Sequence, residues 1–321
     1  MAGEESTPML PFQTLAPWLE MRFSRPISRI ALDAGSSCPN RDGTRGFGGC
    51  TYCDVEGSGT GALKSGVELA AQLDAGLRKI ARRPDGAGAI AYLQSYSNTY
   101  VSPARLDEVL GVVEARLGNA PVPIVAFSIA TRPDTLPDWA IERLLRLQER
   151  VEVWVELGLE SASDEVLSAI RRLHTLAEFE DAAERLARAG LLGVGHAILG
   201  LPGDGRIGAQ RTAEALARSA LLGVKVHHLM VLKKTQLAVQ YRRGEIELLD
   251  EAQYIEWLAD FTERLRPDQV LHRITGDSPA EALIAPAPNF DKNRVREGLA
   301  RTLRARGTRQ GSRYPATRSA L

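Results

Sequence analysis

Residues 33–54 read DAGSSCPNRDGTRGFGGCTYCD, and this glycine-rich segment contains all three cysteines of the 321-residue chain. Eleven residues separate Cys38 from Cys50, and two separate Cys50 from Cys53. Three thiolates on one segment can converge on one metal centre, but they cannot fill four coordination positions. An open coordination position is typical of a catalytic metal site, whereas a structural site is closed.

The cysteine spacing leaves three interpretations open. The first is a structural zinc site with a histidine as the fourth ligand, although the nearest histidine is His174 and structural zinc ligands usually come in close pairs. The second is three reduced cysteines without a metal, which is an unusually dense grouping. The third is an iron–sulfur cluster, in which one iron would lack a protein ligand and could bind another molecule. The spacing favours the cluster.

Composition excludes several classes of protein. Hydrophobic residues make up 44% and charged residues 25% of the chain, as in soluble globular proteins, and no apolar run approaches the roughly 20 residues of a membrane span. The start, MAGEESTPML, lacks the apolar core of a secretory signal, so we expect a cytoplasmic protein that does not bind membranes. Basic and acidic residues number 40 each, so no net charge would attract nucleic acid.

From residue 27 onward, short apolar runs alternate with segments whose apolar residues have helical spacing. This alternation predicts βαβ units and a parallel sheet. Six or more units predict a barrel or partial barrel, with a doubly wound open sheet as the alternative. The predicted strands are 27–34, 89–95, 123–130, 151–160, 191–200, 224–232 and a late 271–274, and the predicted helices are 67–82, 103–117, 137–149, 177–189, 210–222, 254–265 and 291–303.

Polar residues follow the predicted strands at the points where the strands end. In both candidate folds, the loops at the carboxyl ends of parallel strands carry the functional site. We therefore expect these loops to share one rim. They are the cysteine segment and residues 95–98, 131–134, 160–161 and 202–204.

The cysteine segment resembles the cluster loop of radical S-adenosylmethionine (SAM) enzymes of the YhcC/YtqA type. Further segments resemble other blocks of that family in the same order, so the likeness covers residues 25–300. The chain is also similar to the radical SAM part of the Elongator catalytic subunit. The matching segments are SIATRPD (128–134), VEVWVELGLESA (151–162), HAILGLPGDG (196–205), KVHHLMVLK (225–233) and LHRITGD (271–277).

The resemblance implies an α/β fold, namely a partial (β/α)6 TIM-like barrel with an N-terminal arm and a helical C-terminal extension. We expect an arm over residues 1–24, in which LAPWLEMRF could form a short covering helix, and a barrel core over 25–275. A helical extension over 276–306 and a basic, disordered tail over 307–321 would follow.

The resemblance also implies the cofactors. Cys38, Cys50 and Cys53 would hold a [4Fe-4S] cluster, and SAM would bind the fourth iron through its amino and carboxylate groups. An electron donor such as flavodoxin or ferredoxin would reduce the cluster. The electron would cleave SAM to a 5′-deoxyadenosyl radical, which would abstract hydrogen from the substrate.

The resemblance implies that nine further residues bind SAM, among which Gln94 and Ser95 stand where many radical SAM enzymes carry a Gly-Gly-Glu. Arg132 could instead pair with a glutamate of the site or form a structural salt bridge, and Gln94 with Ser95 could be a polar turn. Glu156 lies in an apolar strand, where an unpaired carboxylate is costly to bury, so a site role is favoured. The nine residues are Tyr52, Gln94, Ser95, Arg132, Glu156, Glu160, Ser161, His196 and Ile198.

The late strands carry further candidates. Strand geometry allows only one of His227 and His228 to face the barrel interior. Lys225, Lys233 and Arg273 could form a basic lining for a substrate phosphate or carboxylate. Residues 170–175, IRRLHT, depart from the Asn-Arg-Gly-His that relatives often show, which could alter substrate specificity.

The sequence thus predicts a radical SAM enzyme with an unidentified substrate. A tRNA base side chain is the leading hypothesis, because Elongator-like enzymes act on tRNA and the C-terminal end is rich in arginine. The absence of further cysteines argues against a second all-cysteine cluster. The alternative is a non-catalytic, zinc-binding interaction module that uses the three cysteines and a histidine.

Overall fold

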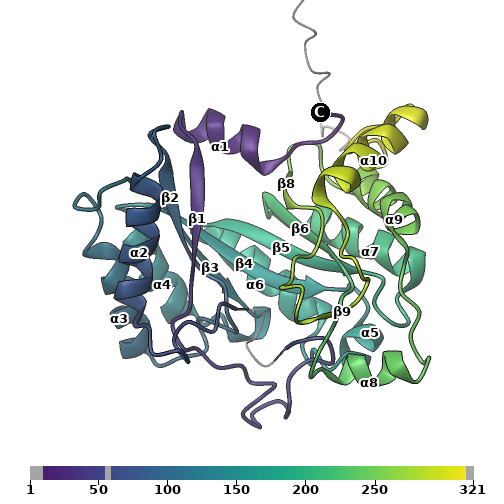
Figure 1. Cartoon of the computed structure of the whole chain (residues 1–321), viewed down its shortest axis with the longest axis horizontal. Coiled ribbons are helices and arrows are strands. Elements are labelled where there is room, and N and C mark those ends of the chain that lie inside the picture. The colour runs from purple at the N-terminus through teal and green to yellow at the C-terminus, as the bar shows by residue number, and fades with distance from the viewer. Residues whose placement is uncertain (1–9, 55–58, 316–321) are drawn as a thin grey trace, which may run out of the picture.

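Seven parallel strands form one curved, open sheet, and β1 and β8 are its two edges (Figure 1). The computed structural model describes residues 10–54 and 59–315. Each strand pairs with the next along the order β1-β2-β3-β4-β5-β6-β8. The strands are β1 (Ile27–Leu32), β2 (Gly88–Leu93), β3 (Ile124–Thr131), β4 (Glu152–Glu160), β5 (Leu192–Leu199), β6 (Gly223–His228) and β8 (Val270–Arg273).

Helices pack on the outer face of this sheet and bury the larger hydrophobic core. Leu73 and Leu77 of α2, for example, lie in the same core cluster as Leu32 of β1. Because helices between the strands cover one face while the other encloses a cavity, the predicted partial barrel is confirmed. The covering helices are α2 (Leu69–Ala81), α3 (Pro103–Glu114), α4 (Asp138–Gln148), α6 (Leu176–Ala189), α7 (Gly205–Arg218) and α9 (Glu251–Arg264).

The expected covering helix is α1 (Leu15–Phe23), and it closes the amino-terminal end of the half-barrel. Its Trp18 ring meets the buried ring of Trp154 edge-on, with the ring centroids 5.7 Å apart. Leu15 and Leu19 join Trp154 in a second apolar cluster on the inner face of the sheet. The inner space at this end is therefore filled, and a cavity remains at the carboxyl ends of the strands.

Several short elements escaped prediction because they are too short to show a period. The run 224–232 divides into β6 and β7 (Val231–Leu232), and β7 pairs antiparallel with β9 (Leu283–Ala285). Two helices, α5 (Asp164–Ala169) and α8 (Gln236–Arg242), and the 3₁₀ turn η1 (Pro133–Thr135) were also not expected. None of the helices in the described part of the chain is long and apolar enough to span a lipid bilayer.

The expectation of a disordered tail is wrong for residues 307–315, which follow α10 (Lys292–Ala305). Gln310 is buried, and its side chain donates to the carbonyls of Arg266 and Gln269 at 2.7 Å. Arg313 pairs with the buried Glu263 at 2.7 Å. The tail is ordered because its polar groups complete hydrogen bonds within the fold, and residues 316–321 lie outside the described part.

Candidate active site

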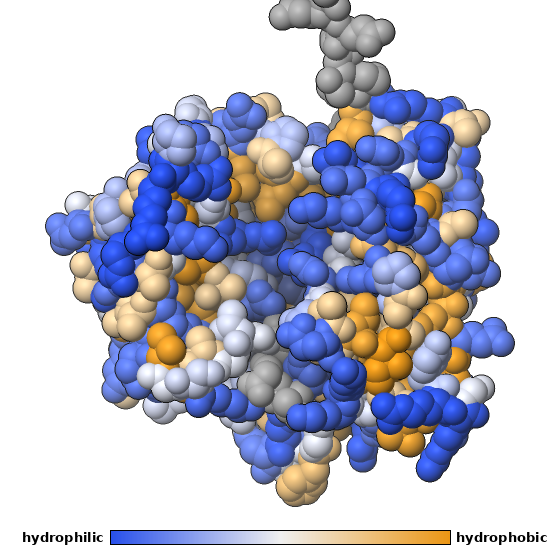
Figure 2. Space-filling view, in the orientation of Figure 1, coloured by the Kyte–Doolittle hydropathy of each residue, from blue (hydrophilic) through white to orange (hydrophobic). Residues whose placement is uncertain are grey.

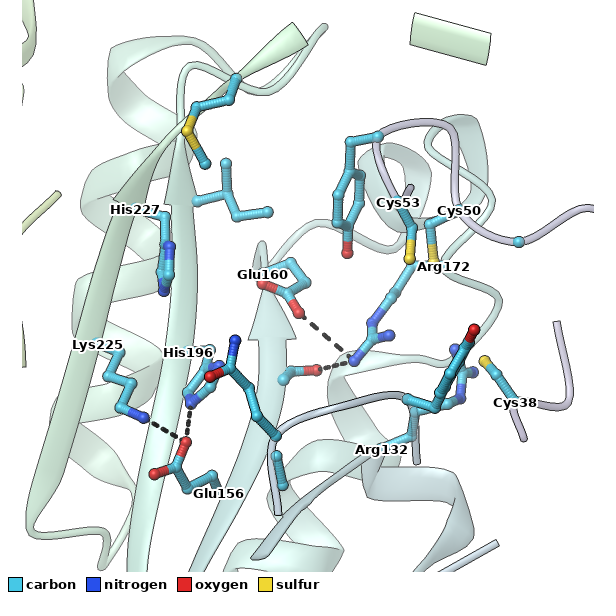
Figure 3. Close-up of a pocket in the computed structure, with 18 of the residues that line it drawn as sticks. Cys38, Cys50, Cys53, Arg132, Glu156, Glu160, Arg172, His196, Lys225 and His227 are labelled. Atoms are coloured by element: carbon cyan, nitrogen blue, oxygen red, sulfur yellow. Dashed lines mark hydrogen bonds and ion pairs between the residues drawn. The ribbon is translucent and has the colours of Figure 1, made fainter. Parts of the chain in front are cut away.

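One cavity of about 210 Å³ opens at the carboxyl ends of the strands, and all three cysteines line it. Cys38 and Cys50 are buried, and Cys53 is half-buried. At the other end of the cavity lie the charged side chains of the strand interiors, including Glu156 and Lys225 (Figure 3). The expectation that the loops after the first strands share one rim with the cysteines is met for the loops that carry Gln94, Arg132 and Glu160.

Nitrogen donors approach two of the cysteine sulfurs. The Arg41 Nη2 donates to Cys53 Sγ at 3.2 Å, and the Asn40 Nδ2 lies 3.5 Å from Cys50 Sγ. Burial, together with the neighbouring Cys50, raises the pKa of Cys53 to about 12 against the opposing effect of Arg41. Burial therefore disfavours a free thiolate at Cys53, whereas a thiol that coordinates a metal is deprotonated by the metal.

The zinc alternative with His174 as the fourth ligand is not supported by the position of that histidine. His174 does not line the cavity with the cysteines. Burial and the nearby Arg172 and Arg132 lower the pKa of His174 to about 2, so it is neutral.

A polar layer crosses the inner face of the sheet, with one side chain from each of six adjacent strands. Its members are Tyr92, Ser128, Glu156, His196, Lys225 and Arg273. Strand pairing places His196 beside Lys225 and Lys225 beside Arg273.

Glu156 is the centre of this polar layer. Its carboxylate accepts hydrogen bonds from Tyr92 Oη at 2.7 Å and from Ser128 Oγ at 2.9 Å. It also contacts Lys225 Nζ at 2.5 Å and His196 Nε2 at 2.9 Å. Burial alone would raise the pKa of Glu156, but Lys225 and His196 hold that pKa well below its usual value. A carboxylate with four partners is the arrangement that makes a buried charge tolerable.

Glu160 is directed into the cavity by an irregularity in β4. The register with β5 shifts between Gly158 and Glu160, and Glu160 has a φ of 69°. Its carboxylate lies 3.4 Å from Arg172 Nη2, and that guanidinium also donates to the Gly158 carbonyl at 3.1 Å. A side chain at Gly158 would collide with both charged groups, which would then have to move.

Arg172 is the main residue that sequence reasoning missed. It lies in the segment 170–175, which was noted only as a departure from relatives, and its side chain lines the cavity. Its Nε is buried and has no partner among the described residues. The one available indication was an arginine within a segment that departs from the pattern of relatives.

Arg132 does not pair with a glutamate, so that expectation is wrong. Its Nε and Nη2 donate to Asp134 at 2.9 and 2.8 Å, which is the structural salt bridge considered as the alternative. The remaining Nη1 is buried and unpartnered in the described structure. Arg132 also lines the cavity, so this nitrogen is a second unused donor of the site.

The other predicted SAM residues divide by position. Tyr52, Gln94, His196 and Ile198 line the cavity. Ser95 and Ser161 are buried and do not line it. Ser161 Oγ instead donates to Asp204 Oδ1 at 2.8 Å.

The two neighbouring histidines of β6 have different surroundings, as strand alternation predicts. The His227 ring lies 6.0 Å from the His196 ring at the cavity. The His228 ring stacks on Phe290 at 4.4 Å and hydrogen-bonds the Asn289 side chain at 2.8 Å. Both histidines line the cavity, and His227 is the one that lies beside His196.

Comparison with known protein families supports one assignment. Residues 38–216 match the Radical SAM superfamily, beginning at the first cysteine, and residues 221–305 match the Radical_SAM C-terminal domain. The chain belongs to the radical SAM superfamily. It is therefore a radical SAM enzyme, a family that generally uses a [4Fe-4S] cluster and SAM, and the zinc-binding module is set aside.

Similar proteins include uncharacterized protein YtqA of Bacillus subtilis, which is 35% identical over 94% of this chain and 92% of its own length. Protein YhcC of Escherichia coli is 31% identical over 84% of both chains. Among solved structures, the archaeal Methanocaldococcus infernus Elp3 has a TM-score of 0.66 at 20% identity. That match covers 89% of this chain and 64% of the Elp3 chain, and it shows the shared fold.

The buried pair of Ser161 and Asp204 predicts a pH-dependent effect. Burial raises the pKa of Asp204 to about 6 from 3.8, although the Ser161 hydroxyl opposes the shift. Between these pH values the folded chain retains a proton that the unfolded chain releases, so stability falls as the pH rises. Asp204→Asn removes the ionisable group and therefore the loss of stability on its ionisation. It is expected to raise the free energy of unfolding by up to about 3 kcal/mol above pH 6.

Urea unfolding at pH 4 and pH 8 measures this difference. The gain from Asp204→Asn should appear at pH 8 and largely vanish at pH 4. The exposed Asp181, which pairs with Arg185 on α6, gives the control Asp181→Asn, whose small effect should be similar at both pH values. An equal gain from Asp204→Asn at both pH values would contradict the prediction.

Proposed function

We propose that Cys38, Cys50 and Cys53 hold a [4Fe-4S] cluster and that SAM occupies the adjoining cavity. The observation that carries the proposal is the opening of all three cysteines onto one cavity at the carboxyl rim of the barrel. Arg41 and Asn40 contact two of the sulfurs, and hydrogen bonds and charges near the sulfurs tune a cluster's reduction potential. When bound, the reduced cluster supplies the electron that cleaves SAM to a 5′-deoxyadenosyl radical.

The unused donors suit the carboxylate of SAM. Arg132 Nη1 and Arg172 Nε are buried without partners in the described structure, and both side chains line the cavity near the cysteines (Figure 3). A buried donor without a partner is costly, so an anionic ligand at this place would be stabilised. The Glu160 carboxylate and the Gln94 amide lie on the same lining and are suitable partners for the SAM amino group.

The remaining wall of the cavity is apolar. Tyr52, Ile198, Leu229 and Leu232 line it, and Tyr52 packs against the small core cluster that contains Ile198 and Leu229. Apolar walls exclude water from a reactive intermediate and prevent side reactions. These side chains would flank the adenosine and keep competing hydrogen donors away, while a protein such as flavodoxin or ferredoxin delivers the electron from outside.

Anaerobic reconstitution tests the cluster assignment. The wild-type chain should bind about four iron atoms, turn brown and form 5′-deoxyadenosine when it is reduced in the presence of SAM. Replacement of Cys38, Cys50 or Cys53 by alanine removes a ligand and should abolish the reduced-cluster EPR signal that SAM alters. Binding of one zinc per chain without such a signal would refute the proposal.

The neighbouring arginines Arg171 and Arg172 provide a matched pair for SAM binding. Arg172→Gln removes a buried charged donor from the cavity and should weaken SAM binding by about tenfold or more. Arg171 is exposed, contacts Gln236 and does not line the cavity, so Arg171→Gln should bind SAM like the wild type. Equilibrium dialysis with labelled SAM measures both, and equal affinity of the two variants would contradict the assignment.

We further propose that the substrate is a base side chain in tRNA. The support is sequence similarity to the tRNA uridine(34) acetyltransferase of Methanocaldococcus infernus, 28% identical over 50% of this chain and 30% of that protein. The arginine-rich tail does not add support, because Arg306 and Arg313 are paired with acidic side chains of α9. The tail region also hydrogen-bonds the segment before α1, at the end of the barrel away from the cysteines (Figure 1).

Mass spectrometry of tRNA nucleosides tests this substrate. A strain that lacks the gene should accumulate a precursor nucleoside and lose its product. The wild-type gene should restore the product, whereas a Cys38→Ala gene should not, because the cluster is required. An unchanged nucleoside profile in the deletion strain would rule out the tRNA substrate without affecting the cluster and SAM assignments.

A further inference from the structure

The polar layer contains more positive than negative charge. Lys225 and Arg273 are its two cations, and Glu156 is its one carboxylate. Lys225 is satisfied by Glu156 at 2.5 Å and by Tyr92 Oη at 3.2 Å. The Arg273 guanidinium, in contrast, makes no hydrogen bond or ion pair with any of the described residues, although it lines the cavity.

An irregularity in β8 directs Arg273 to this place. Val224 pairs with Leu271 and Lys225 pairs with Arg273, so His272 is an extra residue in the ladder. His272 packs on Trp154, with the ring centroids 5.4 Å apart, and Arg273 lines the cavity beside Lys225. Bulges of this kind often re-aim a side chain next to an active site.

A second arginine stands on the opposite edge of the half-barrel. Arg29 belongs to β1, is exposed, and likewise has no ion-pair partner in the described part of the chain. Burial, and then the positive charge of Arg29, lowers the pKa of Arg273, while Tyr92, Asp277 and Glu156 oppose that shift. Asp277 is exposed and is not within ion-pair distance of Arg273, so the positive charge is only partly balanced. In the same orientation as Figure 1, Figure 2 shows a central hollow bordered by hydrophilic residues on the open side of the molecule.

This positive region is separate from the donors assigned to SAM. Lys225 and Glu156 lie at one end of the cavity, and the cysteines with Arg132 lie at the other (Figure 3). A SAM molecule held at the cysteines would bring its carboxylate to Arg132. The end of the cavity with Lys225 and Glu156 is then left for the substrate.

We propose that Arg273, beside Lys225, binds an anionic group of the substrate, a carboxylate or a phosphate, at the end of the cavity away from the cysteines, and that Arg29 adds its positive charge from the opposite edge of the half-barrel. This inference rests on the proposed radical SAM function and adds a chemical requirement for its substrate. Guanidinium groups bind carboxylates and phosphates through paired hydrogen bonds. Bound there, the anion would leave the rest of the substrate between the polar layer and the cysteine rim, where a hydrogen atom would be removed.

Chemical labelling tests the site without turnover. The reconstituted chain is treated anaerobically with phenylglyoxal, which modifies free guanidinium groups, and each arginine is quantified by peptide mass spectrometry. Inorganic phosphate and acetate are the two probes. At ten times its dissociation constant, a bound anion should slow the labelling of Arg273 by about tenfold. Arg211, exposed on α7, is the internal control and should be labelled at the same rate throughout.

The two probes distinguish the anion sources. Stronger protection of Arg273 by phosphate supports a phosphate-bearing substrate, and stronger protection by acetate supports a carboxylate. Protection by neither probe, or protection by SAM alone, would overturn the inference. Because the measurement requires no turnover, a Cys38→Ala chain should show the same protection, so failure of the cluster assignment can be told apart from failure of the anion site.

A pair of variants tests the contribution of the edge arginine. Arg29→Gln removes an exposed charge at the open side and should weaken the protection by phosphate or acetate by about threefold. Arg211→Gln removes an exposed charge elsewhere and should leave the protection of Arg273 unchanged. Equal protection in the two variants would remove Arg29 from the site.

Discussion

The ion pair between Glu156 and Lys225 is the interaction on which the interior of this half-barrel depends. Both groups are buried on the inner face of the sheet, where a single unpaired charge would be strongly destabilising. Tyr92, Ser128 and His196 complete the hydrogen bonding of the carboxylate from three other strands. One carboxylate thereby connects five strands and fixes the spacing of side chains across the interior.

This network divides the interior into two parts with different chemistry. On the amino-terminal side, Trp154, His272 and the residues of α1 fill the space with aromatic and aliphatic groups. On the carboxyl-terminal side, the cavity extends from the polar layer to the three cysteines. A substrate that enters the cavity therefore meets a charged surface at one end and the cysteine rim at the other.

The alternation of strands and helices could be predicted because buried parallel strands appear as continuous apolar runs. The importance of Glu156 could also be predicted, since a carboxylate in such a run needs partners. Its partners could not be predicted, because they come from positions 28 to 69 residues away and depend on strand order and register.

The side chains that line the cavity after β2 could be predicted only in part. Gln94 and Tyr96 line the cavity, but the intervening Ser95, which was also expected to bind SAM, does not. The excess of arginine near the C-terminus led to the wrong prediction of a disordered tail. The count of charges does not show that Arg306 and Arg313 pair with acidic side chains of α9.

The open edges of the half-barrel have a consequence for solubility. An exposed edge strand offers unpaired backbone groups that can capture a strand of another chain. The segment before α1 occupies one edge, since the Leu271 amide donates to the Gln13 carbonyl at 3.0 Å and Thr14 bridges to Leu271. At the other edge, the charged side chain of Arg29 opposes the pairing of β1 with another strand. A covered edge on one side and a charged edge on the other disfavour intermolecular β-sheet formation at the opening of the half-barrel.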